Sequence, residues 1–229
     1  MEKKSKVIAI DGPSGSGKST IAKLVASKLK LTYLDTGAMF RGIAYHLDSK
    51  GITAQDVSEI DKTLKTMKFI YAKSDSILVE IDGVDLSLKI REHHVSELAS
   101  VYSQVPCVRI YLKELQREIV NTKPSILEGR DIGTVIFPNA ALKFFLTADP
   151  KVRAQRRLAQ LKEKDPNTEL TVTSILADIE KRDMEDSGRA IAPLVKAEDA
   201  IEVDTTSLSI DEVAASIAKY FSESISAFE

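Results

Sequence analysis

A glycine-rich segment follows the first apolar run of the chain. Residues 7–10 are Val-Ile-Ala-Ile, typical of a buried parallel strand, and apolar side chains recur at helical spacing from Ile21 onward. The segment between them matches Gly-x-x-x-x-Gly-Lys-[Ser/Thr] in full. Glycines let the backbone come close to phosphate oxygens, so that backbone N–H groups and the start of the next helix point at the anion. The predicted phosphate-binding loop comprises Gly12, Pro13, Ser14, Gly15, Ser16, Gly17, Lys18, Ser19 and Thr20.

Three side chains at the end of this loop predict how a nucleotide is held. Lys18 can reach the β- and γ-phosphates, the Ser19 hydroxyl can ligate Mg²⁺, and Thr20 can donate to the α-phosphate. The alternative is a glycine-rich turn from strand to helix that binds nothing. Such a turn does not require Lys18 and Ser19 at these offsets, so we expect a nucleotide site.

Composition favours a globular protein with one main core. The chain has 229 residues, of which 43% are hydrophobic, and its 32 basic and 34 acidic side chains leave a formal charge of −2. This balance argues against a general nucleic-acid surface. The single cysteine, Cys107, excludes an internal disulfide framework. No stretch has the length of a membrane span or of a secretory signal, so we expect a cytoplasmic protein without membrane contact.

Strand and helix patterns alternate along most of the chain and predict an α/β fold with a parallel sheet flanked by helices. One part differs. Alternating residues at 77–81 and 84–88 flank Asp82-Gly83, which is a strong hairpin signal. We therefore expect a small antiparallel sheet in an insertion at about residues 52–90. Elsewhere, we expect strands at 31–34, 125–127, 142–146 and 201–203, and helices at 38–47, 108–120, from 150, 173–185 and 210–221.

The absence of a guanine-recognition motif and the presence of several arginines indicate the class of nucleotide-binding protein. A regulatory GTPase needs Asn-Lys-x-Asp to recognise guanine, and that motif does not occur. The chain is also short for a motor. A phosphotransferase that holds two anionic substrates needs arginines near strand ends and on mobile segments, and such arginines are present.

Candidate acceptor residues follow two of the predicted strands. Thr36 comes just after strand 31–34, at the edge where open α/β sheets bind ligands, and Arg41 lies about one helical turn further on. Arg130 and Asp131 follow strand 125–127, where the arginine could bind a phosphate in a bidentate way. The alternatives are a capped helix with an exposed arginine and an ion pair that bridges a turn.

Two helices supply further candidates. Arg182, Asp186 and Arg189 are spaced to share one helical face and so to enter one site. Two of the three arginines at 153, 156 and 157 could close over the triphosphate as a lid, since a flexible Asp-Pro-Asn follows their helix. In both helices, the alternative is a charged face exposed to solvent.

Four long motifs together resemble a known family. Gly-Pro-Ser-Gly-Ser-Gly-Lys-Ser-Thr, Leu-Asp-Thr-Gly-Ala-Met-Phe-Arg, Gly-Arg-Asp-Ile-Gly-Thr-Val-Ile-Phe-Pro and Arg-Ala-Ile-Ala-Pro-Leu occur in this order. They resemble bacterial cytidylate kinases over about residues 6–221. The resemblance implies a nucleoside monophosphate kinase fold with a phosphate-loop core at 1–37 and 105–229, a lid at about 153–170, and an acceptor-binding domain with the antiparallel insert at 38–104.

The resemblance also implies the reaction: ATP with Mg²⁺ phosphorylates CMP or dCMP. It places the acceptor phosphate on Arg41 and Arg130, and the cytosine on Ser100, Arg109 and Arg189, with Thr36 and Asp131 nearby. Arg182 and Asp186 would hold the sugar. The chain departs from the family's more frequent residues at Phe40, where tyrosine is commoner, and at Glu128, where aspartate is commoner.

The expected mechanism requires charge neutralisation more than proton transfer, because the acceptor is already an anion. The expected catalytic residues are Lys18, Arg130, Asp131, Arg153 and Arg157. None of the histidines is expected to be essential, and we expect a monomer. Two alternatives remain open: a kinase for another small acceptor, such as UMP, AMP or shikimate, and a non-catalytic nucleotide sensor.

Overall fold

The computed structural model describes residues 4–72, 74, 76–121 and 123–228. The chain divides into two compact units. The first comprises Met1–Leu34 and Thr122–Glu229, and the second is the continuous segment Asp35–Asn121. The second unit contains the predicted acceptor segment, 38–104, and extends beyond it to include a further helix.

The first unit is built on a five-stranded sheet with the order β2-β6-β1-β7-β8. Its strands are β1 (Ser5–Asp11), β2 (Thr32–Asp35), β6 (Ser125–Gly129), β7 (Ala140–Thr147) and β8 (Ile201–Asp204). The central strand β1 pairs in parallel with β6 and β7, and β7 pairs in parallel with β8. The predicted α/β fold with a parallel sheet is confirmed.

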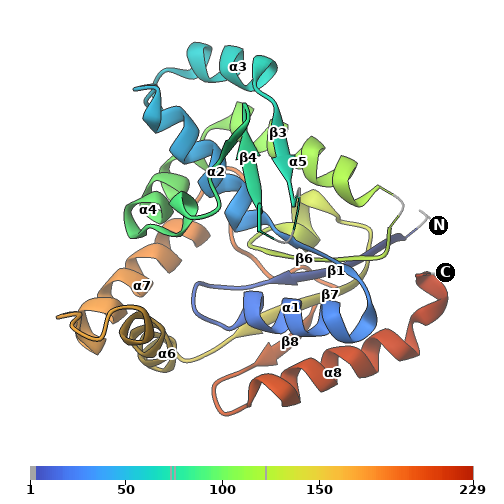
Figure 1. Ribbon diagram of the computed structural model, residues 1–229. Helices are drawn as coiled ribbons and strands as arrows, with labels where there is room; N and C mark the ends of the chain where they lie inside the picture. Colours follow the sequence, from blue (N-terminus) through green and yellow to red (C-terminus); the bar gives the residue numbers. More distant parts are fainter. Residues whose placement is uncertain (1–3, 73, 75, 122, 229) are drawn as a thin grey trace. The chain divides into compact units, whose positions relative to one another are not determined.

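Four long helices belong to this unit: α1 (Lys18–Leu29), α6 (Pro150–Lys164), α7 (Val172–Ser187) and α8 (Ile210–Glu223). Helices α1 and α8 lie side by side (Figure 1) and enclose a core with the sheet that includes Ile10, Val25, Phe144 and Ile217. Helices α6 and α7 pack on each other around Ala154, Ile175 and Ile179. Two short helical turns complete the unit, the π-turn η2 (Ile132–Ile136) and the 3-10 turn η3 (Ile225–Ala227).

Local chemistry explains where these helices start. Asp149 accepts hydrogen bonds from two N–H groups of the first turn of α6, whose first residue is Pro150. Capping boxes open α7, from Thr171 to Ser174, and α8, from Ser209 to Glu212. The break at 165–168 therefore separates two independently capped helices, as the polar composition of that segment predicts.

The second unit contains α2 (Thr36–Ser49), α3 (Val57–Thr66), α4 (His93–Tyr102), α5 (Pro106–Val120) and the 3-10 turn η1 (Lys89–Arg91). Its three-stranded sheet has the order β3-β4-β5 and comprises β3 (Phe69–Tyr71), β4 (Val79–Ile81) and β5 (Val84–Asp85). Both strand pairs are antiparallel. Asp82 and Gly83 form the turn between β4 and β5 with positive φ angles, so the predicted hairpin is confirmed, with shorter strands than expected.

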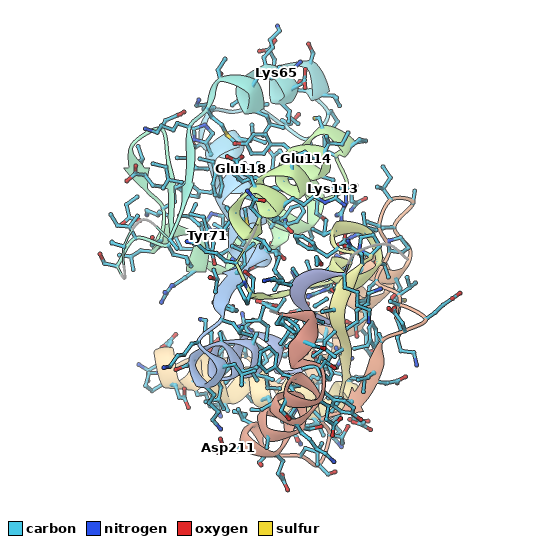
Figure 2. The ribbon with its side chains drawn as sticks, turned by 90° about the vertical axis from the view of Figure 1, so that its right-hand side faces the viewer. Lys65, Tyr71, Lys113, Glu114, Glu118 and Asp211 are labelled. Carbon is cyan, nitrogen blue, oxygen red and sulfur yellow. The ribbon has the colours of Figure 1, made fainter. Side chains whose placement is uncertain are left out.

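Helix α2 packs closely on the buried strand β4, and Figure 1 shows the two side by side. A Cβ atom at Gly42 of α2 would lie only 2.7 Å from the Val79 side chain. Figure 2 labels Lys113, Glu114 and Glu118 along α5, whose buried side includes Val108 and Leu112. Every helix in the described part of the chain is too short or too polar to span a bilayer.

Candidate active site

The predicted phosphate loop connects β1 to α1, at the carboxyl end of the central strand (Figure 1). Gly12, Gly15 and Gly17 have φ angles of 147°, 79° and 88°, which disfavour residues with a side chain. At Gly12 the constraint is also steric, because a Cβ atom there would lie 2.1 Å from the carbonyl oxygen of Leu146. The glycines of the motif therefore allow the backbone to turn directly against β7.

Lys18 lies across its own loop. Its Nζ donates to the carbonyl oxygen of Pro13 at 2.6 Å and to Ser16 Oγ at 3.4 Å, and Ser16 Oγ donates to the same carbonyl. Burial and the neighbouring charge of Arg130 lower the pKa of Lys18 to about 7, although Glu128 and other carboxylates oppose the shift. A phosphate anion beside this amine would favour its charged form.

The Ser19 hydroxyl, at the start of α1, lies beside the carboxylate of Glu128 on β6. The Ser19 hydroxyl donates to Glu128 Oε1 at 2.7 Å, and the Tyr33 hydroxyl donates to the same oxygen at 3.4 Å. Glu128 is 6% exposed. Hydroxyl and carboxylate oxygens are the donors that Mg²⁺ prefers. No cluster of three or more potential metal-ligating His, Cys, Asp or Glu residues occurs among the described residues, so a cation here would also need phosphate or water oxygens.

Asp11, at the end of β1, anchors the turn that follows Arg130 and Asp131. Its two carboxylate oxygens accept from the backbone N–H groups of Ile132 at 2.9 Å and Gly133 at 2.7 Å. Burial raises the pKa of Asp11 to about 6, although these two N–H groups oppose the rise. The sequence carries only a weak signal of this role, a carboxylate between the first strand and the phosphate loop.

Asp186 brings two of the predicted arginines together. Arg130 Nε donates to Asp186 Oδ2 at 2.7 Å, and the Arg189 guanidinium donates to Asp186 Oδ1. Burial alone would raise the pKa of Asp186, but Arg130, Arg189 and Arg182 hold it below its usual value. Asp186 is 1% exposed, so this carboxylate stays ionised in a buried arginine cluster.

The helical face predicted for Arg182, Asp186 and Arg189 is wrong in one respect. Helix α7 ends at Ser187, so Arg189 lies beyond it. Arg189 reaches Asp186 from the following segment and not by helical spacing. Arg182 is half-buried on α7, and its positive charge helps to lower the pKa of Asp186.

The three arginines of α6 lie in different environments. Arg153 is 3% exposed and donates to the carbonyl oxygens of Ala148 at 3.0 Å and Ser14 at 2.9 Å, and to Asp183 Oδ2 at 2.6 Å. It thus links the phosphate loop to both α6 and α7. Arg156 donates to the hydroxyl and carbonyl of Thr205, after β8, whereas Arg157 is exposed. The partner Asp183 was not singled out from the sequence.

In the second unit, Arg41 and Thr36 lie on the first two turns of α2. Asp35 caps this helix, because its Oδ1 accepts from Ala38 N at 2.7 Å. Its Oδ2 lies 3.4 Å from Arg41 Nη2, in an ion pair whose two side chains are 25% and 13% exposed for Arg41 and Asp35. Thr36 is buried. The arginine is therefore held at the start of the helix and remains partly open to solvent.

Arg109 and Ser100 also belong to this unit, on α5 and α4. Arg109 Nη1 donates to the carbonyl oxygen of Ser103 at 3.0 Å, and its guanidinium lies 5.5 Å from the centre of the Phe40 ring. Ser103 Oγ in turn donates to the carbonyl oxygen of Ser100 at 2.8 Å. The aromatic residue at position 40 therefore orients a predicted base-binding arginine through its ring face, which requires no phenolic hydroxyl.

His46 and His94 have ion-pair contacts with carboxylates that are not among the predicted site residues. His46 is buried on α2, with Nε2 3.5 Å from Asp82 at the hairpin turn, and burial lowers its pKa. His94 is exposed on α4, close to Glu92. The side chain of His93 lies outside the described residues.

Comparison with known proteins identifies the family. The cytidylate kinase family model matches residues 8–223. Cytidylate kinase of Clostridium tetani is 47% identical over 96% of this chain and 95% of its own length. The cytidylate kinase of Fusobacterium nucleatum is 46% identical over 93% and 95%, and that of Thermotoga maritima 43% identical over 94% and 96%. The chain therefore belongs to the cytidylate kinase family.

Proposed function

We propose that this protein transfers the γ-phosphoryl group of ATP to CMP or dCMP, giving ADP and CDP or dCDP. The observation that carries this proposal is the family match, which spans residues 8–223 and so includes both units. Relatives that are called cytidylate kinases match at almost full length, which does not favour UMP, AMP or shikimate as the main acceptor. A sensor that only binds ATP would have no use for the acceptor residues.

ATP would bind with its β- and γ-phosphates on the loop N–H groups and on Lys18. The left-handed glycines and the start of α1 support this role, because they direct backbone N–H groups and the helix dipole to one place. The Lys18 amine would become fully protonated as the phosphates approach. It would then offset the negative charge that develops on the oxygen between the β- and γ-phosphorus atoms.

Mg²⁺ would be held by the Ser19 hydroxyl, with Glu128 accepting the hydrogen bond of that hydroxyl or of a coordinated water. The hydroxyl-carboxylate pair at 2.7 Å supports this placement, since both are hard oxygen donors. When bound, the cation would neutralise charge on the β- and γ-phosphates. Ser19 and Glu128 would fix its position relative to the loop.

Most of the proposed acceptor contacts are arginines. We propose that Arg41 and Arg130 bind its phosphate, whose oxygen is an anionic nucleophile and therefore needs no strong general base. Ser100, Arg109 and Arg189 would contact cytosine, with Thr36 and Asp131 nearby, and Arg182 and Asp186 would contact the sugar. The buried contacts of Asp186 and Arg109 support these roles, because they fix each side chain before the substrate arrives.

Arg153 and Arg157 are the proposed lid arginines. Arg153 already contacts the carbonyl oxygen of Ser14 in the phosphate loop, so its charge lies beside the loop. Arg157 is exposed and one turn further along α6. We propose that they add positive charge during transfer and that the enzyme acts as a monomer.

The direct test is ADP formation from Mg-ATP with CMP, dCMP, UMP, AMP and shikimate at equal concentrations. We expect fast turnover with CMP and dCMP and little with the others. Lys18→Ala should retain the fold, judged by circular dichroism, and lower kcat by about 10²-fold or more. Near-normal turnover in that variant would contradict the role of the loop. If none of the acceptors raises ADP formation, the proposed acceptor is wrong.

A further inference from the structure

Tyr71 connects the small antiparallel sheet to the start of helix α2. It is the last residue of β3, and its hydroxyl accepts a hydrogen bond from the backbone N–H of Asp35 at 2.8 Å. The two residues are 36 positions apart in the chain and belong to the same compact unit. Figure 2 labels Tyr71. The hydroxyl thus fixes the residue that precedes α2.

Asp35 controls two features of α2 at once. One carboxylate oxygen accepts from Ala38 N at 2.7 Å and so caps the helix, and the other lies 3.4 Å from Arg41 Nη2. The direction of the Arg41 guanidinium therefore depends on where the Asp35 backbone lies. Because the Tyr71 hydroxyl holds that backbone, it acts on Arg41 through Asp35.

The sheet gives Tyr71 a fixed position. Tyr71 pairs with Val79 of β4, and all three residues of β4 are buried. Val79 in turn packs on α2, where a Cβ atom at Gly42 would come within 2.7 Å of it. The sheet is therefore in contact with α2 at two places: the middle of the helix, through Gly42, and the residue before its start, through Tyr71.

We infer that Tyr71 is a positioning residue for binding of the acceptor phosphate. It makes the orientation of Arg41 depend on the antiparallel insert. The inference rests on the proposed function, in which Arg41 binds the phosphate of CMP. Without the hydroxyl, the Asp35 N–H loses this acceptor, and the Asp35–Arg41 pair becomes free to shift.

The test compares Tyr71→Phe with Tyr111→Phe. Tyr111 lies half-buried on α5 of the same unit, and its hydroxyl makes no hydrogen bond to a described residue. We expect Tyr71→Phe to raise KM for CMP about 3- to 10-fold, the effect of one lost hydrogen bond, with kcat and KM for ATP within about twofold of wild type. Tyr111→Phe should match wild type. Partial unfolding lowers kcat and leaves both KM values unchanged, so KM separates positioning from folding.

A double-mutant cycle with Arg41→Ala decides whether the effect passes through Arg41. In the Arg41→Ala background, adding Tyr71→Phe should change KM for CMP by less than about twofold. If the two effects multiply in full, or if Tyr71→Phe alone leaves KM for CMP unchanged, the inference is overturned while the proposed function stands. If wild-type enzyme does not phosphorylate CMP, the proposed function itself is overturned, which is a separate outcome of the same assay.

Discussion

The charge of Lys18 depends on its surroundings. Its burial and the nearby charge of Arg130 lower the pKa of the amine to about 7, and its hydrogen-bond partners are atoms of its own loop. In the protein without nucleotide the amine is therefore largely neutral at pH 8 and becomes charged below pH 7. A bound triphosphate favours the charged form and raises this pKa.

This shift predicts that ATP binding takes up a proton. At pH 8 the phosphates of ATP are already ionised, so an uptake of up to about one proton per site reports on Lys18. Isothermal titration in two buffers with different heats of ionisation measures it. Lys18→Arg is the control, because a guanidinium stays charged throughout this range. Equal heats in both buffers for the wild type would refute the prediction.

Affinity for ATP should also fall as the pH rises above 7.

At the level of single elements, the turn from β1 into the phosphate loop is tightly constrained. Gly12 has a φ of 147°, and a Cβ atom there would lie 2.1 Å from the carbonyl oxygen of Leu146 on β7. The obstacle is backbone of the central sheet, which cannot move aside as a flexible side chain would. The loop and the sheet are therefore fixed to each other at this residue.

Gly12→Ala should lower the free energy of unfolding by about 3–5 kcal/mol and weaken ATP binding strongly. Gly51→Ala is the matched control, since Gly51 has a φ of 70° but a Cβ atom there would meet no described atom within 4 Å. It should cost only the backbone strain, about 1–2 kcal/mol. Urea unfolding of both variants provides the comparison. Equal losses in the two variants would show that steric contact with Leu146 is unimportant.

Elements with strong local signals could be predicted from the sequence. The phosphate loop, the parallel strands and the Asp82-Gly83 hairpin each depend on residues close together in the chain. Helices α3 and α4 were not predicted: α3, for example, buries only Ile60 and Leu64, a pattern too sparse to stand out. A helix is therefore hard to predict from the sequence when its buried apolar residues are few, even if their spacing is helical.

The site residues that sequence analysis missed depend on distant contacts. Asp11 meets Ile132 across 121 positions of the chain, and Asp183 meets Arg153 across 30. No local pattern reveals such pairs. The sequence analysis treats the three α6 arginines as one group, but their contacts differ. Arg156 is bound to Thr205 and Arg153 to the phosphate loop. Arg157 remains the exposed member of the three.

At the scale of the whole molecule, the phosphate loop and one of the two arginines proposed to bind the acceptor phosphate belong to different units. Lys18 belongs to the first unit and Arg41 to the second. A ligand that binds only the folded protein stabilises it by about 2.7 kcal/mol at 100 times its dissociation constant. In a protein of this length, that corresponds to a rise in the unfolding midpoint of about 5 °C or more.

Thermal unfolding should therefore separate the two sites. A non-hydrolysable ATP analogue and CMP should each raise the midpoint of the wild type. Lys18→Ala should lose the shift caused by the analogue and keep that caused by CMP, whereas Arg41→Ala should do the reverse. Differential scanning fluorimetry measures all four combinations. A full CMP shift in Arg41→Ala would remove Arg41 from the acceptor site.

The second unit is a single uninterrupted stretch of chain, Asp35–Asn121. The chain leaves the first unit at the end of β2 and returns just before β6, and these two strands are neighbours in the sheet. The segment is thus joined to the first unit at its two ends and could be exchanged by one recombination event at each end. In a chimaera made with a relative, Arg41, Ser100 and Arg109 would travel together with Tyr71 and Asp35. The acceptor residues of this segment would then be inherited as a block, whereas the phosphate loop and the acceptor residues at 130–189 would keep their sequence.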